Sequence, residues 1–243
     1  MRLFFIVISF FFVYNLYSQG ELYSESRMYN RNEKSFGAVF ASNGFGFNYK
    51  IGRRIDGKKK LLIEFDALYF KHPKEIRIKT YDSGNRFVFG KMNFPVNLRA
   101  SIGRQKVLYE KKDRNGVKIS YFIDAGISAV LLKPIYYNLI SDGNLTEQKF
   151  DITEIHTFSQ IHSRSAFFTG IDETEIIPGI HLKLGFDFDF AVNDDKINAL
   201  EAGIALDAYL KNIQIMATEK NPIAIFTMFV TYRFGNTIDT KLN

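Results

Sequence analysis

Apolar and polar side chains alternate with a period of two through most of this chain. Between residues 179 and 192 every even position is apolar. The odd positions of that segment include His181, Lys183, Asp187 and Asp189. A period of two places the two sets on opposite faces of a β-strand. The pattern predicts the strand but not its surroundings, because a soluble sandwich would bury the apolar face and a membrane barrel would turn it toward lipid.

Similar alternation in other segments predicts an all-β chain with no long helix. We expect eight strands, at residues 35–42, 44–54, 60–81, 86–110, 117–132, 179–191, 197–210 and 222–235. Bacterial single-chain barrels have an even number of antiparallel strands, and eight leave an interior that side chains just fill. Ten strands would follow if Asn93–Pro95 formed a turn. At His72–Pro73 the apolar phase slips, which indicates a bulge or the point where a strand leaves its layer.

Three features favour an antiparallel transmembrane β-barrel over a soluble sandwich. The first two are the length of the strands and the lengths of the connections between them. Alternation from Val88 to Ile102 covers 15 residues, whereas soluble strands average about 5–6 and tilted membrane strands need about 9–11. The connections also alternate in length. Those near residues 57, 113 and 195 are short, whereas 133–178 is long. Outer-membrane barrels show this asymmetry, with short periplasmic turns and longer outer loops.

The third feature is the charge carried on the polar faces of the predicted strands. If the apolar faces meet lipid, these charged groups line one closed lumen, where acids and bases are expected to pair. The predicted lumen network comprises Lys50, Glu64, Asp66, Lys91, Arg99, Asp124, His181, Lys183, Asp187, Asp189, Glu201, Asp207 and Arg233. A mutually satisfied interior is the favoured interpretation, and a proton-linked or ligand-linked site is the alternative.

The N-terminus has the layout of a secretory signal peptide. Arg2 precedes an apolar run from Leu3 to Tyr14, which is too short for a permanent membrane anchor, and small or polar residues follow. We expect cleavage after Ser18 and export through the Sec pathway to the outer membrane. The chain then divides into a signal peptide at 1–18, a periplasmic lead at 19–34, a barrel at 35–235 and a periplasmic tail at 236–243.

Composition excludes several classes of function. The 243 residues include no Cys, which rules out a disulfide framework, thiol catalysis, a zinc–thiolate site and a lipoprotein anchor. The net charge of +6 comes from scattered basic clusters that are typical of solvated turns, so we predict no nucleic-acid partner. His72, His156, His162 and His181 lack the spacing of metal ligands. We therefore predict no metal site and no cofactor.

Two outer segments carry the remaining candidate chemistry. Residues 162–165 read HSRS, and outer-membrane lipid hydrolases use His and Ser near the barrel rim. A nucleophile also needs an orienting third group, so a polar loop is the favoured interpretation and no catalytic residue is predicted. A loop as long as 133–178 is uncommon unless it is functional or disordered. We expect any contact with a protein partner, or any plug of the lumen, to come from this loop.

Several stretches resemble a family of small outer-membrane β-barrel proteins. They are KHPKEIRI, LLKPIYY, DDKINALEAGIALDAYLKNIQIMATEKN and FVTYRFG. The chain resembles porin-like barrels of the Bacteroidota, a group with no assigned activity, and the resemblance covers most of the mature chain. It implies the barrel fold and the outer membrane, and it transfers no functional residue. Many such barrels end on an aromatic residue, whereas here GNTIDTKLN follows Phe234.

These sequence features are compatible with three functions. The leading hypothesis is a non-enzymatic barrel, surrounded by outer-membrane lipid, that acts as a structural subunit, as part of an assembly or secretion machinery, or as an adhesion-like surface protein. The second is a small porin or transport channel, which a larger strand count would favour. The third is a barrel enzyme that acts on lipid or peptide through His162 and Ser163.

Overall fold

The protein folds as a closed antiparallel barrel of eight strands, as the alternation predicts. The computed structural model describes residues 31–79, 86–111, 116–141, 144–151, 161–193, 195–217 and 221–239. The predicted signal peptide, residues 19–30 of the predicted lead and residues 240–243 of the predicted tail lie outside these residues. The predicted barrel bounds of 35 and 235 are wrong, because the first barrel strand begins at Arg31 and the last ends at Asp239. Among the described residues, no helix is long and apolar enough to span a bilayer.

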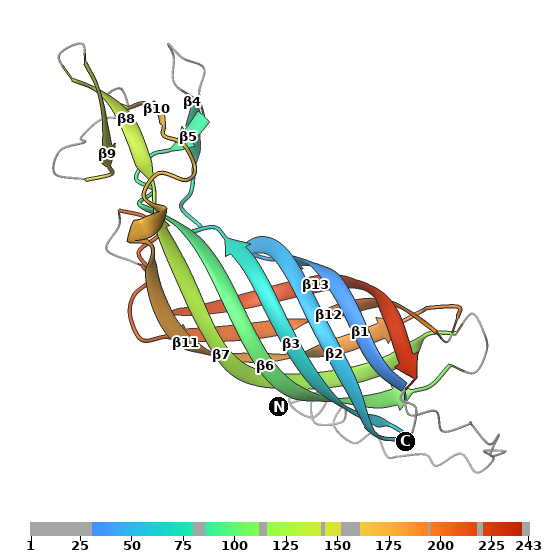
Figure 1. Cartoon of the computed structure of the whole chain (residues 1–243). Helices are drawn as coiled ribbons and strands as arrows, with labels where there is room; N and C mark the ends of the chain where they lie inside the picture. Colours follow the sequence, from blue (N-terminus) through green and yellow to red (C-terminus); the bar gives the residue numbers. More distant parts are fainter. Residues whose placement is uncertain are drawn as a thin grey trace, which may run out of the picture.

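Eight long strands form the wall of the barrel (Figure 1). They are β1 (Arg31–Ala41), β2 (Gly44–Asp56), β3 (Lys59–Phe70), β6 (Asn93–Tyr109), β7 (Lys118–Pro134), β11 (Glu175–Asp189), β12 (Lys196–Tyr209) and β13 (Ala224–Asp239). Around the ring the order is β1, β13, β12, β11, β7, β6, β3 and β2, and β1 pairs with β2 and with β13. Closure leaves no free sheet edge.

The ten-strand alternative is wrong, because β6 continues through the proposed turn. Pro95 pairs with Leu132 of β7. Pairing with β3 begins only at Val96, so the N–H that proline lacks removes no hydrogen bond to β3.

The two ends of the barrel differ in the length of their connections. At one end, here called the turn end, the connections are residues 57–58, 110–117 and 190–195. At the other, the loop end, two residues join β1 to β2, but the remaining connections are 71–92, 135–174 and 210–223. This is the predicted asymmetry.

A loop-end extension stands off the barrel (Figure 1). It comprises a hairpin of β4 (Arg77–Lys79) and β5 (Arg86–Val88), a sheet of β8 (Tyr136–Ser141), β9 (Asn144–Lys149) and β10 (Ile161–Arg164), and the short 3-10 helix η2 (Ile171–Glu173). Two predicted strand bounds are therefore wrong. The strand expected to reach residue 81 leaves the barrel after Phe70, just before the phase slip at His72–Pro73, and the strand expected from residue 86 begins at Asn93.

The outer face of the barrel is apolar. Its exposed side chains include Phe36, Phe47, Phe65, Ile102, Ile127, Ile180, Phe186, Leu206, Phe226, Met228 and Phe234. We call this surface the apolar belt. From Leu61 to Tyr69 the outer face of β3 rises roughly 20 Å, at about 3.3 Å per residue and a tilt of about 40°. Membrane barrels carry an apolar band about 25 Å tall.

A row of aromatic rings marks the loop end of this belt. The ring of Tyr69 lies 5.6 Å from that of Phe45 and 4.5 Å from that of Phe94. The ring of Phe94 lies 5.3 Å from that of Phe167, which lies 5.5 Å from that of Phe168. The row thus connects the rims of β2, β3 and β6 with the segment between β10 and η2. Aromatic girdles of this kind flank the apolar band of membrane barrels.

The loop end of the lumen is covered by residues 212–217, here called the plug segment. Ile213 and Ile215 are 0% and 1% exposed, and they pack against inward-facing apolar side chains of β3, β7, β11, β12 and β13. The amide of Met92 donates to the carbonyl of Ile215 at 2.9 Å, and Asn221 hydrogen-bonds to the backbone of the plug segment. The plug was expected from 133–178, but among the described residues it comes from 212–217. Within 133–178, the strands β8, β9 and β10 stand off the barrel (Figure 1).

Candidate functional site

Ion pairs cross the lumen between strands that do not pair in the sheet. Lys183 of β11 donates to Glu64 of β3, although β7 and β6 separate these strands on the ring. Lys50 of β2 donates to Glu201 of β12, and its Nζ lies 3.2 Å from a carboxylate oxygen of Glu64. All four side chains are at most 3% exposed. These ion pairs therefore occupy the middle of the barrel.

A second cluster joins β6, β11 and β12. Arg99 donates to both carboxylate oxygens of Asp207, from Nε at 3.0 Å and from Nη2 at 2.5 Å. Nδ1 of His181 lies 2.9 Å from the same carboxylate. Asp66 lies 3.8 Å from Nη1 of Arg99 and accepts from the amide of Asn48 at 2.5 Å. Such two-point guanidinium–carboxylate contacts fix geometry as well as charge.

Arg233 of β13 extends the network toward the turn end. It donates to Asp187 of β11, its Nε lies 2.8 Å from Glu201, and its Nη1 donates to the hydroxyl of Ser35 at 2.8 Å. The three partners come from β11, β12 and β1, so one guanidinium links strands on both sides of β13.

Two aromatic rings share the lumen with the charged groups. The ammonium group of Lys50 lies 4.5 Å from the ring centroid of Phe122, and that of Lys183 lies 4.7 Å from that of Phe229. Both rings are at most 5% exposed. Cation–π contacts strengthen when the cation is removed from water. Rings and ion pairs together fill the interior at this level.

Asp124 has a different environment from the other lumen acids. It is 1% exposed, and neither carboxylate oxygen has a hydrogen-bond partner among the described residues. Its side chain leans over Gly103 on the neighbouring β6, where an added Cβ would meet Oδ1 of Asp124 at 1.7 Å. A glycine is required here because the carboxylate occupies the space of a side chain.

Asp189 lies at the turn end, beside four charged groups that the sequence analysis did not select. Its carboxylate lies 2.8 Å from Nζ of Lys118 and 3.7 Å from Nζ of Lys111. Nearby on β3 and β1, Lys60 pairs with Glu33. Lys60 is in phase with the inward-facing Glu64, so the alternation contained the signal for it. Lys111 lies in a predicted turn, where alternation says nothing.

The placement of Lys91 in the lumen is wrong. Lys91 lies in the connection between β5 and β6, and its ammonium group donates to Glu75 at 2.8 Å and to the hydroxyl of Tyr69 at 2.9 Å. Alternation placed it on a barrel strand because residues 86 to 92 share the phase of β6. The barrel strand begins only at Asn93, after a turn in which Gly90 has φ of 75°.

The HSRS stretch lies in the loop-end extension, with His162 to Arg164 on β10 and Ser165 just after it. The pairing of β10 with β8 shifts register between Ile161 and Ser163, so His162 lies at an irregularity of the strand. The hydroxyl of Ser163 accepts from the amide of Asn138, and that of Ser165 donates to Asn138 Oδ1, both at 3.0 Å. No group of three or more His, Asp or Glu in the described ranges is placed to hold a metal ion.

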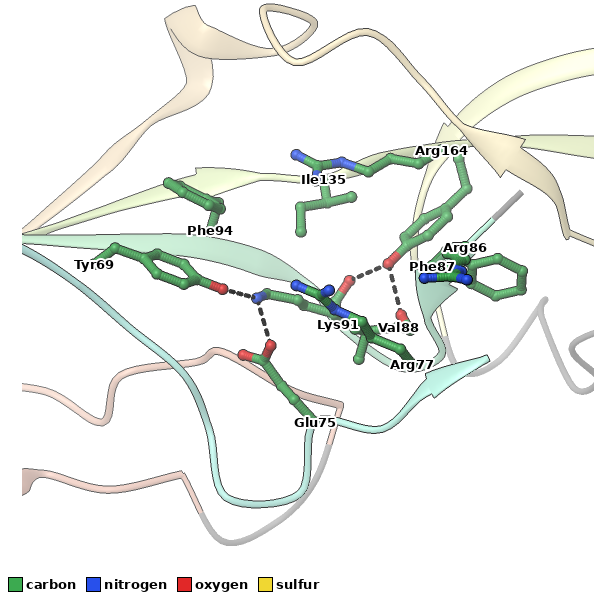
Figure 2. Close-up of a pocket in the computed structure, with 11 residues that line it drawn as sticks. Tyr69, Glu75, Arg77, Arg86, Phe87, Val88, Lys91, Phe94, Ile135 and Arg164 are labelled. Atoms are coloured by element: carbon green, nitrogen blue, oxygen red, sulfur yellow. Dashed lines mark hydrogen bonds and ion pairs between the residues drawn. The ribbon is translucent and has the colours of Figure 1, made fainter. Parts of the chain in front are cut away.

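A pocket of about 260 Å³ opens between the barrel rim and the loop-end extension (Figure 2). Its lining residues are Tyr69, Glu75, Arg77, Arg86, Phe87, Val88, Lys91, Phe94, Ile135, Tyr137 and Arg164. We call this cavity the basic pocket, because four of these side chains are cationic and only Glu75 is anionic. The sequence analysis missed it, since it is assembled from four segments that lie far apart in the chain.

Tyr137 fixes the floor of the basic pocket. Its hydroxyl lies 3.0 Å from the carbonyl oxygen of Val88 and 2.9 Å from that of Lys91, and the side chain is 1% exposed. Burial raises the pKa of this phenol above its usual range, so it stays protonated, and its single O–H is shared between these two carbonyls. The contact ties β8 to the β5–β6 connection.

No protein-family model matches this chain, and no curated protein matches it. Solved barrels of low identity do match. Neisserial surface protein A shares 11% identity at a TM-score of 0.37, covering 86% of this chain and 96% of its own. Ail of Yersinia pestis, solved in complex with the heparin analogue sucrose octasulfate, shares 8% identity at a TM-score of 0.41. The match covers 87% of this chain and 100% of that one. A major outer membrane protein from Thermus thermophilus shares 12% identity at a TM-score of 0.40, and the match covers 84% of this chain and 99% of that one. Matches at this level assign neither a family nor an activity to this chain.

Proposed function

We propose that this protein is an integral outer-membrane β-barrel without enzymatic activity, exported through the Sec pathway after loss of residues 1–18. Its barrel serves as a sealed membrane anchor, and its loop-end extension makes the functional contacts, as a structural subunit or as part of an outer-membrane assembly or secretion machinery. The observation that carries the proposal is that the barrel is inverted relative to a soluble protein, with apolar side chains outside and charged ones inside. Ile127 is 69% exposed and Phe47 is 74% exposed, whereas Glu201 and Asp207 are fully buried.

The inverted barrel fits lipid better than water. A soluble protein would leave the whole apolar belt in contact with water, at roughly 25 cal/mol for each Å². In a bilayer the same side chains meet acyl chains, and closure of the ring satisfies the backbone groups that lipid cannot hydrogen-bond. The aromatic row then lies at the level of the headgroups.

A sealed lumen supports an anchor rather than a channel. Lys183–Glu64 and Lys50–Glu201 cross the interior, Phe122 occupies the space beside them, and the plug segment covers the loop end. An ion would have to displace buried, paired charges to pass, and buried pairs are costly to separate.

Gel mobility and planar-bilayer current test the proposal together. We expect protein folded in detergent to migrate faster unheated than boiled, as closed barrels that resist dodecyl sulfate do. We expect the same sample to give no reproducible current steps in bilayers where a large porin, the positive control, conducts. Discrete steps from the folded sample would contradict the sealed lumen and favour the porin alternative. Solubility without detergent would contradict the membrane barrel itself.

A further inference from the structure

The basic pocket holds three arginines for which the described residues supply no ion-pair partner. Arg77, Arg86 and Arg164 are exposed at the pocket, and no described carboxylate lies within ion-pair distance of them. The guanidinium carbon of Arg164 lies 5.8 Å from the ring centroid of Phe167. Five N–H donors in a fixed plane match two oxygens of one phosphate or carboxylate.

The one acid of the pocket does not neutralise these arginines. One carboxylate oxygen of Glu75 accepts from Lys91 at 2.8 Å, and the other accepts from the amide of His72 at 3.0 Å. Glu75 and Lys91 thus cancel each other. The three guanidinium groups give the pocket a net positive charge, and their side chains line it from β4, β5 and β10 (Figure 2).

The hairpin holds two of these arginines on a single face. Arg77 pairs with Val88 in the β4–β5 ladder, and Lys79 pairs with Arg86. Cross-strand partners point to the same side, and so do residues two apart, so Arg77, Lys79 and Arg86 share one face. Like charges on neighbouring positions destabilise a hairpin unless an anion neutralises them.

The aromatic row sets the height of the pocket relative to the membrane. Tyr69 and Phe94 line the pocket and also belong to that row. On the proposed function, this places the pocket at the headgroup layer on the loop-end side of the bilayer. Its volume of about 260 Å³ is several times the roughly 30 Å³ that a water molecule occupies, so it can hold a phosphate group with part of its hydration.

We propose that the basic pocket binds the phosphate group of a membrane lipid through Arg77, Arg86 and Arg164. The inference rests on the proposed function for the source of the phosphate, because the chemistry alone would also accept free phosphate. Binding there would hold the extension against the membrane surface.

Native mass spectrometry of the full chain in a neutral detergent tests the site. The three probes are short-chain phosphatidic acid, short-chain phosphatidylcholine and inorganic phosphate. We expect the protein to retain phosphatidic acid at least tenfold more tightly than either of the others. We expect the variant R77Q/R86Q/R164Q to lose that retention at least tenfold. The variant R53Q/R104Q/K106Q removes the same charge from exposed positions near the turn end, and it should bind as the parent does.

Each other outcome overturns a stated part of the proposal. Unchanged retention in R77Q/R86Q/R164Q, or an equal loss in the control variant, would overturn the site. Inorganic phosphate bound as tightly as phosphatidic acid would overturn the assignment to a lipid. Gel mobility and solubility of the unliganded protein are recorded first, so failure of the membrane barrel is recognised separately from failure of the site.

Discussion

The lumen and the basic pocket both contain several charged side chains, but those of the lumen are mostly paired and buried, whereas the three arginines of the pocket are exposed. In the lumen, Lys183 and Arg99 each meet a carboxylate, and every partner is nearly inaccessible to water. In the pocket, Arg77 and Arg164 face a cavity, and the described part of the chain supplies no carboxylate that pairs with them. A buried charge is costly unless it is paired, whereas an unpaired one persists where water or a ligand reaches it. The carboxyl group of Asp124, which has no hydrogen-bond partner among the described residues, is an exception in the lumen. The comparison separates a structural network from a binding surface.

The largest effect is expected where one partner is removed from the lumen. Glu64→Ala leaves Lys183 and Lys50 without their shared carboxylate, and loss of one partner of a buried ion pair costs about 3–5 kcal/mol. Unfolding by urea in detergent, with gel mobility as the readout of folded protein, measures the free energy of unfolding. Glu147→Ala, at an exposed position of β9, is the control and should change that free energy by less than about 0.5 kcal/mol. Equal effects of the two substitutions would remove the distinction between lumen and surface.

Truncation within the plug segment comes next. Ile213→Ala removes a fully buried side chain from the apolar cluster at the loop end, which costs about 2–4 kcal/mol. The control is Leu210→Ala, because Leu210 lies near the same segment but is 77% exposed. Thermal loss of the fast-migrating gel band compares the two variants. If Ile213→Ala and Leu210→Ala lose this band at the same temperature, the plug segment does not seal the lumen as described.

Two glycines of the lumen provide a smaller, matched test. Gly103→Ala would place a methyl group 1.7 Å from Asp124 and 2.3 Å from the carbonyl oxygen of Ile123, and we expect a loss of about 1–3 kcal/mol. Gly52→Ala meets nothing nearer than 3.4 Å and should be nearly neutral. Both positions lie on barrel strands, so urea midpoints can be compared directly. A harmless Gly103→Ala would show that Asp124 does not occupy the space over Gly103.

The smallest effect on stability is expected in the basic pocket. R77Q/R86Q/R164Q breaks no ion pair between described residues and relieves repulsion, so the free energy of unfolding should change by no more than about 0.5 kcal/mol per site. The same urea titration measures it, with Glu64→Ala as the reference for a paired group. A loss comparable to that of Glu64→Ala would mean that these arginines serve the fold and not a ligand.

Alternation was enough to predict the barrel strands, because side chains of a strand change face at every residue. Strand length, the unequal connections and the charge on the polar faces were needed to predict the membrane barrel. The alternation within each strand was enough to place Glu64, Arg99 and Asp207 on the inner face of the barrel. It failed at Lys91, where a turn and an unrelated connection happened to continue the phase of β6. It did not detect the basic pocket, because Arg77, Arg86 and Arg164 are brought together only when the hairpin and the β8–β10 sheet dock above the rim.

The orientation of the apolar belt can be measured with single tryptophans, since the chain contains none. Ile127 on β7 and Leu145 on β9 are similarly exposed, at 69% and 65%, but one lies in the belt and the other in the extension. In vesicles whose lipids carry brominated acyl chains, we expect strong quenching of Ile127→Trp and none of Leu145→Trp, which dissolved iodide should quench instead. Quenching of Ile127→Trp by iodide and not by the brominated lipid would contradict the membrane barrel.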